Sequence, residues 1–358
     1  MLVEQQSLLL LTTRRAEQFA HVLHQYLIWL LLSSYLVAAF LPAFGLWLRD
    51  ASIGQMHLFQ ESTKISIPMV LLAFLLLNAG LGIQITSVTE WRRSGVALIS
   101  GLMGNLFIPL LYITAVSVMM HGWHNPDEVQ NILVGLALVA SMPVAGSSTA
   151  WSQNANGDMT LSLGLVLLST LLSPLTTPVV LHTVAFMTTG DYSEDLHELA
   201  SYGTGTFLML FVLLPSIVGI AIRKVASVRV IKEIKPYQKV VNTFVLLILS
   251  YSNAAVSLPA AVQRFDPDFL ILTVAIVAVL CAIAFLAGWG VSLGLKASRE
   301  QEAALMFGLG MNNNGTGLVL ASVALPDHPL AMLPIIFYNL VQHLVAGMVD
   351  YLRYRSAD

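Results

Sequence analysis

Residues 308–315 read GLGMNNNG, near the middle of an otherwise apolar stretch over residues 300–325. Three consecutive asparagines put amide groups where hydrocarbon offers no hydrogen-bond partner, and the glycines beside them relax the backbone. A similar interruption occurs earlier, where residues 141–149 read SMPVAGSST inside the apolar stretch 131–157. Proline removes a backbone donor, so a helix does not run through it undisturbed. Both stretches therefore predict membrane helices that break near their middle.

The composition around these stretches is that of an integral membrane protein. Of the 358 residues, 56% are hydrophobic and 10% are charged, whereas soluble domains carry about 25% charged residues. The 17 Lys and Arg against 20 Asp and Glu give no basic surface for nucleic acid. A single cysteine, Cys281, excludes an intrachain disulfide. The spans hold no nucleophile-and-base motif such as GxSxG or HExxH, so we do not expect an enzyme.

Ten stretches have the roughly 20 apolar residues that a helix needs to cross a bilayer. They cover residues 26–48, 65–86, 95–120, 131–157, 159–187, 203–223, 240–263, 268–294, 300–325 and 329–352. With ten spans, all Lys and Arg except Arg49, Lys64 and Arg264 fall on the side that holds both termini. Because positive residues concentrate in cytoplasmic loops, we predict a multi-pass protein of the plasma or inner membrane with both termini cytoplasmic.

A central basic loop, residues 224–239, separates five spans from five. The predicted organisation is an N-terminal cytoplasmic extension (1–25), the first five spans plus the sixth (26–223), the loop, spans seven to ten (240–352) and a cytoplasmic tail (353–358). Five spans per half make the two halves run in opposite senses, and each half has its break in its fourth span. The fold class predicted is an all-α membrane protein with ten transmembrane helices, a five-plus-five inverted repeat in which discontinuous spans 4 and 9 cross.

The residues after each break are candidates for a binding site. Ser, Thr and Asn favour helix N-caps, so Ser147, Ser148 and Thr149 are expected to cap one half-helix and Asn313 and Asn314 the other. Helix N-termini present free N–H groups and a partial positive charge, which suit an anion. We therefore expect Ser147, Ser148, Asn313 and Asn314 to bind a small organic anion. A further N-cap, Asp158, is expected to begin the fifth span.

Three motifs resemble the bile acid:sodium symporter family. They are the segment Pro143–Thr149 followed by ANGDMTLS (155–162), the run STLLSPLTTP (169–178) and GMNNNGTGL (310–318). The resemblance implies a core of spans 3–5 and 8–10 that moves against a panel of spans 1, 2, 6 and 7. It also implies a secondary transporter of a small or amphipathic organic anion, bile-acid-like or a monocarboxylate, that works by alternating access with sodium.

The same resemblance supplies candidate sodium ligands, which are Ser148, Thr149, Ser162 and Asn312. The glutamate that opens the family's second motif falls on Gly308, and a threonine of its fifth span falls on Val166. A carboxylate offsets the charge of a buried cation, so its loss leaves several alternatives open. In the first alternative, sodium binds through neutral oxygens, and in the second another ion is coupled. In the remaining two, the chain is a sodium-independent uniporter or exchanger, or a non-transporting anion receptor. Apart from sodium no cofactor is expected, and the sequence does not indicate an oligomeric state.

Overall fold

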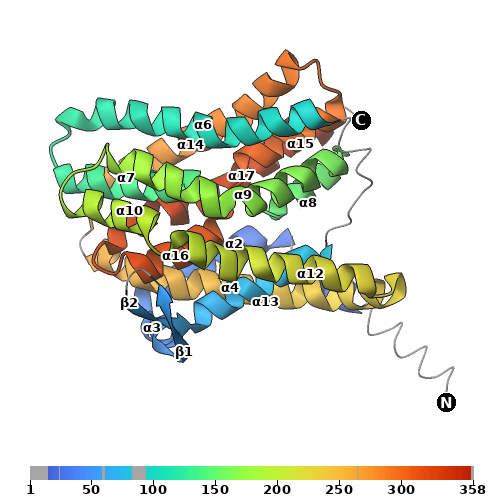
Figure 1. The fold of residues 1–358 in the computed structure, drawn as a ribbon, viewed down its shortest axis with the longest axis horizontal. Coiled ribbons are helices and arrows are strands. Elements are labelled where there is room, and N and C mark those ends of the chain that lie inside the picture. Colours follow the sequence, from blue (N-terminus) through green and yellow to red (C-terminus); the bar gives the residue numbers. More distant parts are fainter. Residues whose placement is uncertain (1–14, 24, 59–60, 83–93, 264, 356–358) are drawn as a thin grey trace.

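The computed structural model describes residues 15–23, 25–58, 61–82, 94–263 and 265–355, which are mostly helical (Figure 1). Among these residues, strands β1 (Ser52–Leu58) and β2 (Glu61–Ser66) form an antiparallel hairpin that the sequence pattern does not predict. The α-helices that follow Arg15–Leu23 are α2 (Leu27–Phe40), α3 (Ala43–Asp50), α4 (Ile67–Gly82), α6 (Gly95–Met119), α7 (Pro126–Ser141), α8 (Ser147–Asn154), α9 (Met159–Ala185), α10 (Asp191–Ser201), α11 (Thr204–Leu208), α12 (Leu214–Val225), α13 (Val228–Gln263), α14 (Pro267–Gly294), α15 (Arg299–Gly310), α16 (Asn314–Ala324) and α17 (Leu333–Val349). Short 3-10 or π turns are η1 (Met120–Gly122), η2 (Met209–Leu213), η3 (Pro329–Met332) and η4 (Asp350–Arg355).

Six helical segments among the described residues are long and apolar enough to cross a membrane, which makes the chain an integral multi-pass protein. They cover Gly95–Gly122, Met159–Ala185, Thr204–Val225, Glu233–Gln263, Pro267–Gly294 and Pro329–Tyr354, and the bent pair Arg15–Leu23 and Leu27–Phe40 is a seventh candidate. The other predicted spans are not continuous helices of this length. Breaks divide α7 from α8 and α15 from α16, and α4 has 16 residues, with residues 83–93 outside the described ranges.

Side-chain caps explain where several helices begin. Asn125 caps α7, Asp266 caps α14 and Ser298 caps α15, each by accepting a hydrogen bond from a backbone N–H of the first turn. Asp158 caps α9 by accepting from the N–H groups of Thr160 and Leu161, as predicted. These caps fix the helix starts on both sides of the broken helices.

The helices form two layers (Figure 1). We call α6, α7, α8, α9, α14, α15 and α17 the large layer, and α2, α3, α4, α12 and α13 the small layer. Within the small layer α4 packs on α12, and α13 packs on α2, α3 and α4. Helix α16 lies between the layers, because it contacts α17 on one side and α4 and α13 on the other. Arg49, near the end of α3, donates a hydrogen bond to the carbonyl oxygen of Ser322 in α16.

Two segments that were predicted to lie outside the spans are helical in the structure. Residues 224–239, expected as a loop, are the end of α12, a two-residue connection and the first turns of α13. The hydroxyl of Ser227 accepts from the N–H of Val230 at the start of α13, and the charged residues that follow have good helix propensity. Of the predicted tail, residues 353–355 continue the last helix, and 356–358 lie outside the described ranges. Of the predicted extension, residues 1–14 and 24 also lie outside them.

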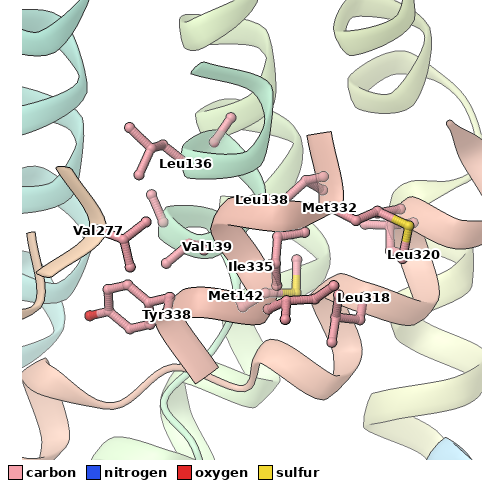
Figure 2. Packing of buried hydrophobic residues seen from close by; sticks show 14 of the residues in the cluster. Leu136, Leu138, Val139, Met142, Val277, Leu318, Leu320, Met332, Ile335 and Tyr338 are labelled. Carbon is pink, nitrogen blue, oxygen red and sulfur yellow. The ribbon is translucent and has the colours of Figure 1, made fainter. Parts of the chain in front are cut away.

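Buried hydrophobic side chains pack around the breaks (Figure 2). This core is built from residues of α7, the first break, α14, α16, η3 and α17, all fully or almost fully buried. They include Leu136, Leu138, Val139, Met142, Val277, Leu318, Leu320, Met332, Ile335 and Tyr338. In a membrane protein such packing, rather than exclusion from water, holds helices together. The core therefore fixes the broken helices in place.

Candidate functional site

The two breaks cross each other and pair through their backbones. Val144 and Asn312 form an isolated antiparallel bridge. The N–H of Ala145 donates to the carbonyl oxygen of Met311 at 2.9 Å, and the N–H of Asn313 donates to the carbonyl oxygen of Pro143 at 2.9 Å. Backbone groups that lose their helical partners must find others inside a membrane. Each break supplies these partners to the other, which explains how both interruptions are tolerated at one place.

The first break does not use its hydroxyl side chains as caps, contrary to the prediction. Helix α8 begins at Ser147, and its N-cap is Gly146, which already has right-handed helical dihedrals and offers no side chain. The N–H groups of Ser148 and Thr149 donate to the carbonyl oxygens of Ala145 and Gly146, so they are not free for an anion. The hydroxyl of Thr149 also donates to the carbonyl oxygen of Gly146, at 2.7 Å.

The second break agrees with the prediction at Asn313 and differs at Asn314. Asn313 is the N-cap of α16, and its Oδ1 accepts from the N–H of Thr316 at 3.3 Å. Asn314 is the first residue of the helix, and its amide nitrogen donates to the carbonyl oxygen of Asn312 and to Oε1 of Gln342. Asn312 donates from Nδ2 to the carbonyl oxygen of Val139 at 2.9 Å. The three asparagines therefore have three different roles.

Several buried side-chain oxygens of the breaks and of the helices beside them have no hydrogen-bond partner among the described residues. They belong to Asn105, Ser148, Ser152, Ser162, Asn312, Asn314 and Thr316. An unsatisfied buried polar group costs about 1–3 kcal/mol, so these oxygens on neighbouring elements make the crossing the candidate site for a ligand. Ser148, Ser162 and Asn312 are three of the four predicted sodium ligands, and hydroxyl and amide oxygens suit a hard cation. The fourth, Thr149, is less buried and already bonded to Gly146.

A leucine fills the space beside Gly308, where the resemblance in sequence implies a glutamate. A Cβ atom on Gly308 would lie 2.7 Å from Cδ1 of Leu165, which is fully buried in a small apolar cluster. The other buried members of this cluster are Ala97, Leu98, Leu161, Ala304, Leu305 and Leu309. The nearest carboxylate along the chain, Glu302, is held by Arg353 through bonds of 2.6 and 2.9 Å. A cation at the crossing would therefore be bound by neutral oxygens.

Polar residues that were not predicted as site residues support the crossing. Gln342 of α17 accepts from the N–H of Asn312 at 3.1 Å, and Thr177 of α9 donates to the carbonyl oxygen of Ser141 at 2.6 Å. Ser169 accepts from the N–H of Val144 at 3.0 Å and lines a cavity of about 140 Å³ between α6, α7 and α9. The signal available in the sequence was a polar residue inside an apolar span, which often marks function in membrane proteins.

Comparison with known proteins yields one family and two relatives. Residues 69–264 match the model of the Sodium Bile acid symporter family. The "Uncharacterized sodium-dependent transporter YocS" of Bacillus subtilis is 24% identical over 307 residues, which are 86% of this chain and 89% of that protein. The "Uncharacterized protein YbaS" of the same organism is 23% identical over 224 residues, or 62% of this chain and 68% of that protein.

Proposed function

Because the chain belongs to the Sodium Bile acid symporter family, we propose that it carries a small or amphipathic organic anion across the membrane by alternating access. The family is one of transporters and not of enzymes. The observation that carries the proposal is the crossing itself, in which two broken helices pair through Val144 and Asn312. Transporters place their binding sites where discontinuous helices meet. A bile-acid-like molecule or a monocarboxylate has the charge and size that we propose for the substrate.

For the topology we propose the ten-span inverted repeat with both termini in the cytoplasm. The distribution of Lys and Arg in the sequence supports it. We assign the large layer with α16 to the moving core, spans 3–5 and 8–10, and the small layer to the panel, spans 1, 2, 6 and 7. The packing of α13 on α2, α3 and α4 supports a panel that holds together by itself.

For the anion we propose Ser147, Ser148, Asn313 and Asn314 as contacts. Ser147 and Asn313 are half-buried beside the crossing and are accessible to a substrate, whereas Ser148 and Asn314 are buried behind them. Two N–H groups of α8 are used within the break, and the amide nitrogen of Asn314 donates to Asn312 and Gln342. Recognition of the acid group therefore relies on the hydroxyls of Ser147 and Ser148 and on the amide of Asn313 more than on the helix N-terminus.

For the coupling ion we propose sodium, held by the unpartnered oxygens of Ser148, Ser162 and Asn312 together with Thr149, whose oxygen keeps an acceptor position. Neutral oxygens can bind monovalent cations in membrane proteins, as backbone carbonyls do in ion filters. The alternative is a sodium-independent uniporter or exchanger, and the specific observation in its favour is Leu165 beside Gly308. In that case water satisfies the oxygens.

Uptake of radiolabelled organic anions into proteoliposomes, with and without a sodium gradient, tests these proposals. Sodium-stimulated uptake is the expected result, and uptake that is unchanged without sodium would exclude sodium coupling. Asn313→Leu removes the cap of α16 and an anion contact, so uptake should be abolished. Thr183→Val is the matched control, because this exposed hydroxyl bonds only within its own helix, to the carbonyl oxygen of Val179. Full uptake by Asn313→Leu would place the site elsewhere, and tight anion binding without flux would identify a receptor.

A further inference from the structure

A chain of buried polar side chains runs from the second break to the small layer. Oε1 of Gln342 accepts from Nδ2 of Asn314 at 3.0 Å, and Nε2 of Gln342 donates to Oδ1 of Asn339 at 3.3 Å. Nδ2 of Asn339 donates to the hydroxyl of Tyr35 at 3.0 Å, which has a further hydrogen bond with Ser250. All five residues are more than nine-tenths buried.

We propose that this chain couples the ligand site at the crossing to the position of the small layer. Gln342 is the positioning residue for the site, and the bond between Asn339 and Tyr35 is the joint between the layers. The proposal rests on the transport function proposed above, and it assigns roles to residues that none of the sequence motifs contain.

The direction of each hydrogen bond is fixed by backbone groups at the crossing. The N–H of Asn312 can only donate, so the atom of Gln342 that faces it must be the acceptor Oε1. The carbonyl oxygens of Asn312 and Val139 can only accept, so the amide nitrogens of Asn314 and Asn312 must face them. The amide orientations at this site therefore follow from the backbone and are not interchangeable.

This fixed polarity explains why two oxygens remain available. Because the amide nitrogens of Asn312 and Asn314 are turned to the backbone and to Gln342, the Oδ1 atoms of both asparagines are left without a partner. These oxygens are then presented to a cation or a donor. Without Gln342, the amide of Asn314 loses an acceptor, and the N–H of Asn312 loses the one acceptor that it has among the described residues. The side chain of Gln342 thus orients the oxygens of Asn312 and Asn314 toward a ligand without binding that ligand itself.

The same polarity continues into the small layer. Nε2 of Gln342 must donate to Asn339, whose amide nitrogen then donates to Tyr35. Tyr35 lies in α2 and Ser250 in α13, whereas Asn339 and Gln342 lie in α17 of the large layer. A rocking movement of the layers must break or stretch the bond between Asn339 and Tyr35. The bond between Asn339 and Tyr35 therefore stabilises the arrangement of the two layers seen in this structure. A ligand that reorients the asparagine amides at the crossing would change the strength of this bond.

Tyr35→Phe tests the joint, because it removes the hydroxyl and keeps the ring. Its matched control is Ser34→Ala, which removes a hydroxyl one residue away that bonds only to the carbonyl oxygen of Leu31 in the same helix. We expect Tyr35→Phe to change the maximal uptake rate about fivefold, the shift that one hydrogen bond supports, with KM and the half-saturating sodium concentration within about twofold of wild type. We expect Gln342→Leu to raise these two constants about tenfold or more, since two bonds at the site are lost. Wild-type kinetics in Tyr35→Phe would overturn the proposal, as would an equal rise of KM in both variants.

A second readout does not depend on transport. A cysteine replacing Gly146 has open space for its side chain at an exposed position, and the native Cys281 is buried. In purified protein, Tyr35→Phe should slow labelling of Gly146→Cys by a water-soluble maleimide about fivefold, and Ser34→Ala should not. An unchanged labelling rate would overturn the coupling whatever the uptake assay shows. Absence of wild-type uptake with altered labelling would instead overturn the transport function and keep the joint.

Discussion

Restoring a carboxylate at position 308 should strengthen sodium binding, provided that Leu165 is also shortened. A Cβ on Gly308 would lie 2.7 Å from Cδ1 of Leu165, and Cγ follows at 3.8 Å. Gly308→Glu alone therefore overpacks the apolar cluster, at a cost of about 1–3 kcal/mol. Leu165→Ala alone leaves a cavity, at a cost of about 2–5 kcal/mol. In the double variant, the new side chain occupies the space that the leucine leaves.

The gain can be estimated from the strength of contacts to charged groups. Such a contact contributes about 1.5–3 kcal/mol, so the sodium concentration for half-maximal uptake should fall about 10- to 100-fold in Gly308→Glu/Leu165→Ala. Uptake of labelled anion into proteoliposomes over a sodium titration measures it. Leu165→Ala is the control for the cavity, and thermal melts of the purified variants verify folding. A double variant that folds and shows the wild-type sodium dependence would refute the reasoning, because it would show that no cation binds near Gly308.

Two further predictions concern stability. Gly310→Ala should destabilise the protein by about 1–3 kcal/mol, because its Cβ would overlap two ring carbons of Phe285. Thermal melts of the variant should show this loss, and Phe285→Leu should restore part of it. A wild-type melting temperature in Gly310→Ala would contradict the packing. Asp195 of α10 lies 3.2 Å from His328, and burial raises the pKa of its carboxyl more than this histidine lowers it. Because the pKa of Asp195 is higher in the folded than in the unfolded protein, this residue contributes most to stability when it is protonated. The contribution falls as the pH rises from the unfolded-state pKa toward the raised pKa of the folded protein. The melting temperature of wild type relative to Asp195→Asn should therefore increase as the pH falls from about 7 to about 4, and parallel pH profiles would refute the assignment.

The positions of the two breaks could be predicted from the sequence, but the side chains that stabilise them could not. Three asparagines and a proline inside apolar spans are signals that depend only on local composition. The cap of α8 depends on the dihedrals of Gly146, which already continue the helix, so the serines that follow have no N-cap position to occupy. Gln342 is 28 residues from Asn314 and acts through tertiary packing that no spacing rule describes. A residue's partner, and not its type, decides these roles.

The missing carboxylate and the unpartnered oxygens together constrain how ion and substrate would bind. A cation held only by neutral oxygens leaves one positive charge uncompensated in a site of low dielectric constant, which is costly. Gly308 and Leu165 offer it no counter-charge, and Glu302 is committed to Arg353. The acid group of an organic anion at Ser147 and Asn313, beside the same crossing, would supply the missing negative charge. Proposed sodium coupling in this chain therefore requires that anion and sodium bind cooperatively, each weakly without the other.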